Sequence, residues 1–257
     1  MPRYKLTIEY DGTPFFGWQV QEDAPSVQGR LRAALADFCG EAVLPYGAGR
    51  TDRGVHATGQ VAHIDLTRSF PPFVIRNALN NHLAPEPISI LTVEEVDAQF
   101  DARFSAVQRH YVYRISNRPA FLALDRHRAW YVPQPLDDEA MHDAGQSLLG
   151  RHDFTTFRSA RCQARSPVKR IDTITVQRDG HVINVSVSAP SFMHHQVRSI
   201  VGSLRLVGEG KWSRSDLEEA LAARDRTRCG PVAVAAGLYF TRVDYDVGEE
   251  ASANVSK

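Results

Sequence analysis

The sequence of 257 residues has few cysteines, no long apolar run and no excess of charge of either sign. Its three cysteines, Cys39, Cys162 and Cys229, are widely spaced and odd in number, which favours reduced thiols over a disulfide framework or a cysteine zinc site. No apolar run approaches the roughly 18 residues of a transmembrane helix. The N-terminus enters a strand-like segment directly, without the apolar core of a signal peptide. We therefore expect a cytoplasmic protein with no membrane partner.

Nucleotide-binding and metal-binding signatures are also missing. Gly47 and Gly49 begin a Gly-x-Gly-x-x-Gly pattern, but Asp52 replaces the third glycine and no helix pattern opens there. The Gly-Lys-Ser/Thr of a P-loop does not occur. His152 beside Asp153 could indicate a proton relay or a metal site, but no second pair has ligand spacing, so loop hydrogen bonds are favoured. The sequence thus predicts no cofactor and no metal.

The balance of charge hides an uneven distribution. Lysine and arginine number 30, as do aspartate and glutamate, and this zero net charge argues weakly against nucleic acid. Cations nevertheless crowd residues 151–170, where Asp153 is the only acid. A basic patch for RNA and a solvated loop with scattered arginines explain this segment equally well. The cations are Arg151, Arg158, Arg161, Arg165, Lys169 and Arg170.

What the sequence does contain is a glycine-rich loop around one carboxylate. Four glycines fall within residues 47–59, so this stretch is a loop, and an alternating strand pattern follows it at 61–66. Arg50 and Arg53 flank Asp52, and opposite charges at short range hold an aspartate ionised. Such a carboxylate can be a nucleophile, a base or a metal ligand. The competing interpretation is a tight turn with a surface ion pair of little energetic value.

Around this loop the first half of the chain follows a strand–helix–strand–strand–helix–strand order, which is typical of a ferredoxin-like unit. Ser26 offers an N-cap to the first helix and Gly40 ends it. The expected strands are 4–10, 61–66 and 88–93, and the expected helices begin near residues 27 and 73.

The second half contains a strand at 110–115 and a hairpin whose turn is Asp179-Gly180. Tyr111 could stack on a base or move a proton, although a strand tyrosine is more often core. An amphipathic helix follows within residues 193–204. Arg198 lies off its apolar stripe and could meet a phosphate or carboxylate, or simply solvent. A short helix near 217–221 and a strand at 237–243 complete the pattern.

Residues 49–57, Gly-Arg-Thr-Asp-Arg-Gly-Val-His-Ala, resemble the active-site motif of the tRNA pseudouridine synthase A family. Further blocks match in the family's order, and the resemblance extends from Tyr4 to Tyr245. These blocks are 10–19, 100–115, 191–204 and 237–240. His194 and His195 depart from the residues of many members, which leaves the role of these two histidines open.

The resemblance implies an α+β pseudouridine synthase fold. Two ferredoxin-like (RRM-like) halves would join through a central, mostly antiparallel sheet. Residues 1–105 would form the half that carries the aspartate loop, and 106–248 the half that carries the basic loop and the Arg198 helix. Residues 249–257 are small or charged, and we expect a disordered tail there.

The resemblance also implies an activity: isomerisation of uridine to pseudouridine at positions 38–40 of the tRNA anticodon stem-loop, by a homodimer without cofactor. Asp52 would be the nucleophile or would stabilise an oxocarbenium-like centre. Arg50 and Arg198 would keep Asp52 ionised and oriented. Tyr111 would stack on the base and help to remove the C5 proton. Substrate contacts would come from Arg53, His56, Leu238, Arg161, Arg165, Lys169 and Arg170.

Two other function classes explain part of the pattern. A non-catalytic RNA-binding module of ferredoxin-like halves would account for the aromatics and the basic segment, but not for an aspartate between arginines in a glycine loop. A glycoside hydrolase with an aspartate nucleophile would normally need two carboxylates about 5–10 Å apart, and nothing in the sequence marks a second acid.

Overall fold

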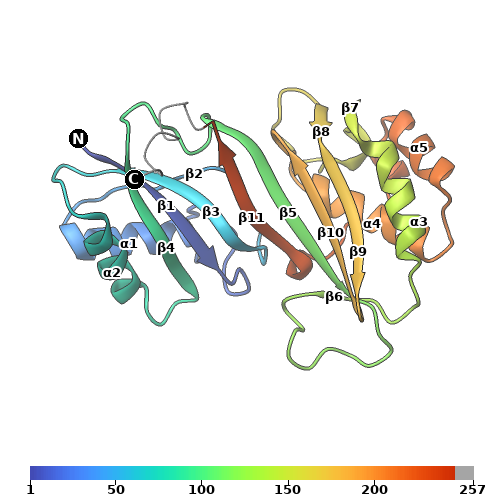
Figure 1. The fold of residues 1–257 in the computed structure, drawn as a ribbon, viewed down its shortest axis with the longest axis horizontal. Coiled ribbons are helices and arrows are strands. Elements are labelled where there is room, and N and C mark those ends of the chain that lie inside the picture. The colour runs from blue at the N-terminus through green and yellow to red at the C-terminus, as the bar shows by residue number, and fades with distance from the viewer. Residues whose placement is uncertain (247–257) are drawn as a thin grey trace, which may run out of the picture.

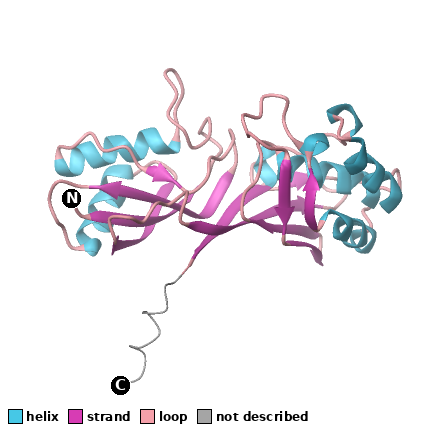
Figure 2. Ribbon diagram, turned by 90° about the horizontal axis from the view of Figure 1, so that it is seen from above, coloured by secondary structure: helices cyan, strands magenta, loops and turns pink. Residues whose placement is uncertain are grey.

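The computed structural model describes residues 1–246, and its backbone is organised around one continuous sheet that crosses the whole molecule (Figures 1 and 2). Seven strands lie side by side in the order β4-β1-β3-β11-β5-β10-β9, while β2 pairs with β3 and β6 with β5. The strands of this sheet are β1 (Arg3–Tyr10), β2 (Tyr46–Gly47), β3 (His56–Asp65), β4 (Ile88–Val96), β5 (Ala106–Ser116), β6 (Trp130–Tyr131), β9 (Thr173–Asp179), β10 (Val182–Ala189) and β11 (Leu238–Tyr245). The predicted tail, 249–257, lies outside the described residues.

Helices gather at the two ends of this sheet, as Figure 1 shows. At one end are α1 (Val27–Cys39) and α2 (Pro72–Leu83), and at the other are α3 (Asp138–Gly145), α4 (Gln196–Gly208) and α5 (Arg214–Ala223). A separate two-stranded sheet pairs β7 (Gly150–Asp153) with β8 (Val168–Ile171). The short 3-10 helices are η1 (Gln146–Leu148), η2 (Thr155–Phe157), η3 (Arg226–Arg228) and η4 (Ala235–Gly237). None of the helices in residues 1–246 is long and apolar enough to cross a membrane.

Both halves of the chain repeat the ferredoxin-like order. The first runs β1-α1-β2-β3-α2-β4 and gives the strand order β4-β1-β3-β2, and the second runs β5-α3-β9-β10-α4-β11 and gives β11-β5-β10-β9. The two units meet where Tyr239 and Phe240 of β11 pair in parallel with His56 and Ala57 of β3. The other pairings among the seven central strands are antiparallel. The predicted fold class is therefore confirmed.

Local sequence signals account for several element boundaries. The Ser26 side chain accepts a hydrogen bond from the backbone N–H of Gly29 at the start of α1, and Gly40 ends that helix with φ of 74°. Gly180 takes a positive φ of 57° in the turn between β9 and β10, as the hairpin requires. The short strands β2, β6, β7 and β8 carry no periodic pattern long enough to predict.

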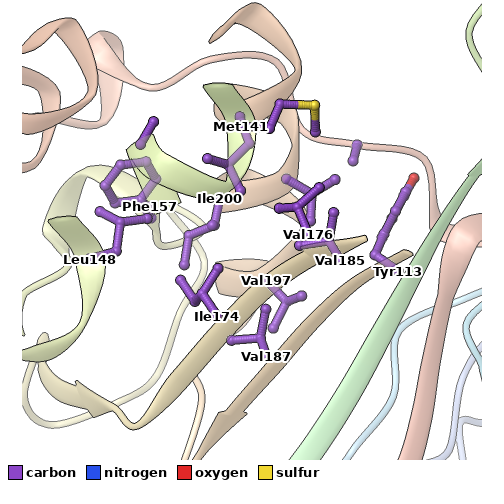
Figure 3. Close-up of a cluster of buried hydrophobic side chains, with 14 of the residues drawn as sticks. Tyr113, Met141, Leu148, Phe157, Ile174, Val176, Val185, Val187, Val197 and Ile200 are labelled. Carbon is purple, nitrogen blue, oxygen red and sulfur yellow. The ribbon is translucent and has the colours of Figure 1, made fainter. Parts of the chain in front are cut away.

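Two hydrophobic cores lie under the sheet, one at each end. The core of the second half joins valines and isoleucines of β9 and β10 to α3 and α4, with Tyr113, Met141 and Ile200 fully buried (Figure 3). Strand β11 contributes to both cores, since Leu238 belongs to the second and Phe240 to the first. The division of the chain at residue 105 stays a prediction.

Candidate active site

The glycine-rich loop between β2 and β3 is held in place by backbone and side-chain hydrogen bonds. The carbonyl oxygen of Thr51 accepts from the N–H of Trp18 at 3.1 Å, and the Thr51 hydroxyl lies 2.8 Å from the hydroxyl of Tyr10. On the next residue, the Asp52 carbonyl accepts from the N–H of Val55 at 3.1 Å. Gln60 is buried and donates to the carbonyl of Gly49 at 2.8 Å. Asp52 therefore sits on a fixed backbone.

Residues 10–19 pack directly against the backbone of this loop. A Cβ on Gly17, whose φ is 99°, would overlap the Thr51 carbonyl oxygen, and a Cβ on Gly12 would overlap the carbonyl of Val55. Only glycine allows such close approach of two backbones. Phe15 and Trp18 are buried beneath the turn, so these two aromatics are packing residues.

The partners of the Asp52 carboxylate come from the other half of the chain. Arg198 of α4 places Nη1 3.1 Å from Oδ2, and His195 places Nε2 3.4 Å from the same oxygen. His194 places its Nε2 3.1 Å from Oδ1. The Asp52 side chain is 23% exposed, so the carboxylate is sheltered and still open to a ligand.

These partners decide the protonation of Asp52. Burial alone would raise the pKa of Asp52, but the hydrogen bond from His194 and the attraction of His195, His194 and Arg198 outweigh burial, so the pKa lies below its ordinary value. Burial lowers the pKa of His195 despite the neighbouring Asp52. The site at neutral pH thus contains a carboxylate that is ionised.

The residues that meet Asp52 are themselves anchored by their backbone. Arg198 donates from Nε to the carbonyl of Ala233 at 2.8 Å, and the N–H of Ala233 returns a bond to the Arg198 carbonyl at 3.1 Å. His195 caps α4 in the left-handed conformation, with φ of 64°. That conformation is uncommon for a residue with a Cβ, and here it brings the imidazole to Asp52.

The two arginines next to Asp52 in the sequence do not pair with it. Among residues 1–246, neither Arg50 nor Arg53 lies within 4.0 Å of an Asp52 carboxylate oxygen, and both are exposed. Arg53 instead places its guanidinium 4.1 Å from the ring centroid of Phe16. Arg50 therefore forms no ion pair with Asp52, and its predicted part in keeping Asp52 ionised stays a prediction.

Tyr111 of β5 lies at the junction of the two halves and packs against both cores. Its ring stacks on that of Phe240 and meets that of Phe192 edge-on at 5.1 Å between centroids. Burial, together with Tyr10 and the charge of Asp52, raises the pKa of Tyr111 above its ordinary value. The phenol therefore keeps its proton at neutral pH. Tyr113 is fully buried, as expected for a core residue.

His56 and Leu238 occupy buried positions. His56 is 2% exposed; its Nδ1 accepts from the N–H of Gly12 at 3.0 Å, and its Nε2 lies 2.8 Å from the carbonyl oxygen of His127. Both ring nitrogens thus contact the protein, Nδ1 also lying 3.2 Å from Oδ1 of Asp11, and the predicted substrate contact of His56 stays a prediction. Leu238 is 6% exposed and belongs to the second core. Its predicted contact with the base stays a prediction.

The basic loop passes beside the Asp52 cluster. The N–H of Ser159 donates to the carbonyl of His194 at 2.9 Å, and Lys169 donates to the hydroxyl of Ser191 at 3.2 Å. Arg161 and Arg165 are exposed, and neither forms an ion pair within the described chain. Arg170 is paired with Asp172 at 2.7 Å. The cations beside the site therefore differ: Arg161 and Arg165 are free to meet an anion, whereas Arg170 is already paired with an aspartate.

His194 and His195 are the site residues that sequence reasoning missed. Their departure from the family pattern was visible, but nothing in the sequence indicated contact with Asp52, which lies more than 140 positions earlier. In the sequence, Phe240 is only the end of the block 237–240, and its stacking on Tyr111 depends on the pairing of β11 with β5.

Comparisons with known proteins identify the family of the chain. A sequence model of the family described as "tRNA pseudouridine synthase" matches residues 6–105 and 144–246. A Xanthobacter autotrophicus protein called tRNA pseudouridine synthase A is 62% identical over 95% of this chain and 100% of its own length. One of the same name from Azorhizobium caulinodans is 63% identical over 95% of both.

Among solved structures, a Cbf5-Nop10-Gar1 complex covers 79% of this chain and 45% of the matched chain, with a TM-score of 0.35 and 12% identity, too low to bear on fold or function. The family model and the two relatives together show the family. The chain belongs to the tRNA pseudouridine synthase family.

Proposed function

We propose that this chain isomerises uridine to pseudouridine in tRNA, at positions 38–40 of the anticodon stem-loop. Family membership supports the reaction and the substrate class. The observation that carries the proposal is the ionised, sheltered carboxylate of Asp52, held by Arg198 and His194 from the other half of the chain. The positions follow from the family resemblance alone.

In this reaction the N1–C1′ bond of uridine breaks, the uracil turns over, and a C5–C1′ bond forms while the C5 proton leaves. Positive charge develops at C1′ when the first bond breaks. Asp52 would attack C1′ as a nucleophile or stabilise that charge, and either role requires the ionised form. Arg198 and His194 would hold the carboxylate in one orientation, which preorganises the site.

Tyr111 would lie against the uracil while it is detached from the ribose. Its ring is fixed by Phe240 and Phe192, which suits stacking on a base. Since the raised pKa keeps the phenol protonated, the hydroxyl would take the C5 proton only as it passes its own proton on. A base in a loop also costs less to extrude than one in a duplex.

The exposed cations around the site would contact RNA. Arg50 and Arg53 lack ion pairs with Asp52, so their guanidinium groups can meet the substrate next to the carboxylate. Arg161, Arg165 and Lys169 would contact phosphates, and Arg170 more weakly because Asp172 neutralises it. We further propose that the protein works as a homodimer in the cytoplasm, as the family resemblance implies, and sedimentation velocity tests the oligomeric state.

The decisive experiment changes the carboxylate and measures binding and chemistry separately. Asp52→Asn and Asp52→Ala should bind tRNA within about threefold of the wild type, because neutralising one acid adds no barrier to RNA. Both should form no measurable pseudouridine. Asp37→Asn, an exposed change on α1, is the matched control and should be fully active. Activity of either Asp52 variant within tenfold of the wild type would remove Asp52 from the chemistry.

A further inference from the structure

Asp52, His194 and His195 form a cluster of possible metal ligands. One carboxylate oxygen and one imidazole nitrogen from each histidine all lie within 4.8 Å of one another. Nε2 of His194 lies 3.1 Å from Oδ1 of Asp52, and Nε2 of His195 lies 3.4 Å from the other oxygen, Oδ2. Thus three donor atoms, from two segments far apart in the sequence, converge on one point.

The spacing of the donors matches the needs of a transition metal. Zinc bonds to histidine nitrogen and carboxylate oxygen at about 2.0–2.2 Å, so neighbouring ligand atoms in a tetrahedral or octahedral site stand about 3.0–3.5 Å apart. The 3.1 Å from His194 to Oδ1 and the 3.4 Å from His195 to Oδ2 each fall in that range, while the three donor atoms together lie within 4.8 Å of one another. A metal placed among the three atoms would therefore reach bonding distance through small side-chain adjustments.

The chemistry of the donors selects the kind of metal. Imidazole suits zinc, copper, iron and nickel, whereas magnesium and calcium prefer oxygen ligands. Two imidazoles and one carboxylate leave at least one coordination position for water, as in zinc sites that exchange ligands. The cluster is thus suited to Zn²⁺ and poorly suited to the Mg²⁺ that accompanies RNA.

The surroundings decide whether such a metal would be resident or transient. The side chains of His194, His195 and Asp52 are 40%, 27% and 23% exposed, so a hydrated ion can enter. Arg198 already lies 3.1 Å from Oδ2 of Asp52. A divalent ion there would share one carboxylate with a guanidinium, and the uncompensated positive charge makes the complex reversible.

We propose that this cluster binds one Zn²⁺ per chain and that the bound zinc inhibits the enzyme. A carboxylate oxygen that coordinates zinc is no longer available to C1′, and the ion occupies the space in front of it. The inhibition rests on the proposed function, whereas the binding rests on the cluster alone. Zinc here is a regulator or inhibitor and has no part in the isomerisation.

Binding is tested by isothermal titration of the full chain, freed of metal with EDTA, with Zn²⁺ as the only added metal. The wild type should bind one zinc ion, and His194→Gln and His195→Asn should each weaken binding by at least about tenfold. Asparagine is chosen at 195 because it tolerates the positive φ found there. Circular dichroism checks that both variants are folded.

Controls separate this cluster from other zinc ligands on the chain. His181→Gln changes an exposed histidine, and Cys162→Ser removes a free cysteine, and neither should alter the stoichiometry or the affinity. A wild type that takes up no zinc would overturn the proposal. So would zinc binding that survives both His194→Gln and His195→Asn unchanged.

Inhibition is tested by measuring pseudouridine formation at constant Mg²⁺ while Zn²⁺ is increased. With tRNA far below its KM, the concentration of zinc for half inhibition should equal the dissociation constant from the titration, and EDTA should restore full activity. If zinc binds but activity is unchanged, the inhibitory half of the proposal fails. If the chain forms no pseudouridine even without zinc, the proposed function fails, and the titration still decides the metal site.

Discussion

The ring of Phe240 stacks on that of Tyr111 with centroids 4.7 Å apart and planes inclined by 15°. The two residues face each other across paired strands, Phe240 on β11 and Tyr111 on β5. Phe192, from the segment before α4, closes a second side of the Tyr111 ring. The phenol oxygen therefore has a fixed position near Gly49, where a Cβ would stand 3.8 Å from it.

This fixed position allows the two roles of Tyr111 to be separated. Tyr111→Phe keeps the ring and removes the hydroxyl, so tRNA affinity should change little, because stacking on one base is worth about 1–3 kcal/mol and is retained. Product formation should fall by about 10²–10⁴, the usual contribution of a positioned acid or base. Release of tritium from tRNA that carries 5-tritiated uridine measures the proton step directly.

Tyr111→Ala is the companion variant, since it removes ring and hydroxyl together. Near-normal tritium release from Tyr111→Phe with strong loss from Tyr111→Ala would leave stacking as the only role. A fall in tRNA affinity equal to the fall in rate would instead make Tyr111 a binding residue.

Gly17→Ala should displace the Asp52 loop. Its added Cβ would overlap the Thr51 carbonyl, one residue before Asp52, in a backbone with φ of 99°. A shift of about 1 Å in a catalytic group costs roughly 10²-fold in rate, so activity should drop by about that factor. Gly40→Ala is the matched control, because Gly40 also has a positive φ, of 74°, but open space around it. If the two variants formed pseudouridine at equal rates, the packing of Gly17 against Thr51 would not control the position of Asp52.

The cations of the basic loop should contribute unequally to tRNA binding. Arg161→Ala and Arg165→Ala should each lower the slope of log affinity against log salt by about one. Arg170→Ala should lower it less, because Asp172 lies 2.7 Å from the guanidinium. Filter binding between about 50 and 200 mM salt measures the slopes, and Arg32→Ala on α1 is the control. Unchanged salt slopes for Arg161→Ala and Arg165→Ala would show that these two side chains face solvent and do not contact phosphate.

Stability should decline on the acid side because of His56. Burial lowers the pKa of His56 in the folded chain below the ordinary 6.5, so the unfolded chain takes up the proton first as the pH falls. The folded state therefore loses stability from about pH 6.5 downward, by at most about 1.4 kcal/mol per pH unit from this group. His56→Gln should unfold more easily at pH 7.5 and show a shallower loss between pH 6.5 and 5.

Urea denaturation at several pH values measures this effect, with the exposed change His181→Gln as the control. Burial also lowers the pKa values of His63 and His195. These two histidines account for the dependence of the unfolding free energy on pH that remains in His56→Gln. If the unfolding free energy of His56→Gln fell with pH as steeply as that of the wild type, His56 would not be the source of the acid-side loss.

The elements with strong local signals could be predicted from the sequence. Ser26 and Gly40 mark the two ends of α1, and the Asp179-Gly180 turn marks the hairpin of β9 and β10. The repeated ferredoxin-like order follows once the order of strands and helices is known. The two-residue strands β2 and β6 exist only because neighbouring strands offer hydrogen bonds, and no local pattern encodes them.

The candidate site was predictable in its centre and only in part among the partners of Asp52. The glycines around Asp52 identified the loop, but adjacency to Arg50 and Arg53 suggested ion pairs that the geometry does not contain. Arg198 was found through the family resemblance. The left-handed conformation of His195, which turns its imidazole to Asp52, depends on the docking of α4 against the Asp52 loop and leaves no trace in local propensity.

Strand β11, residues 238–245, is inserted between β3 and β5 in the middle of the sheet. During translation, Asp52, Tyr111 and Arg198 leave the ribosome before this strand does. Until β11 arrives, no strand pairing joins β3 to β5, and Tyr111 lacks the ring of Phe240. The proposed site is therefore completed only once β11 has been made, so a nascent chain that stalls before residue 238 would carry Asp52, Tyr111 and Arg198 without the strand that joins their two halves.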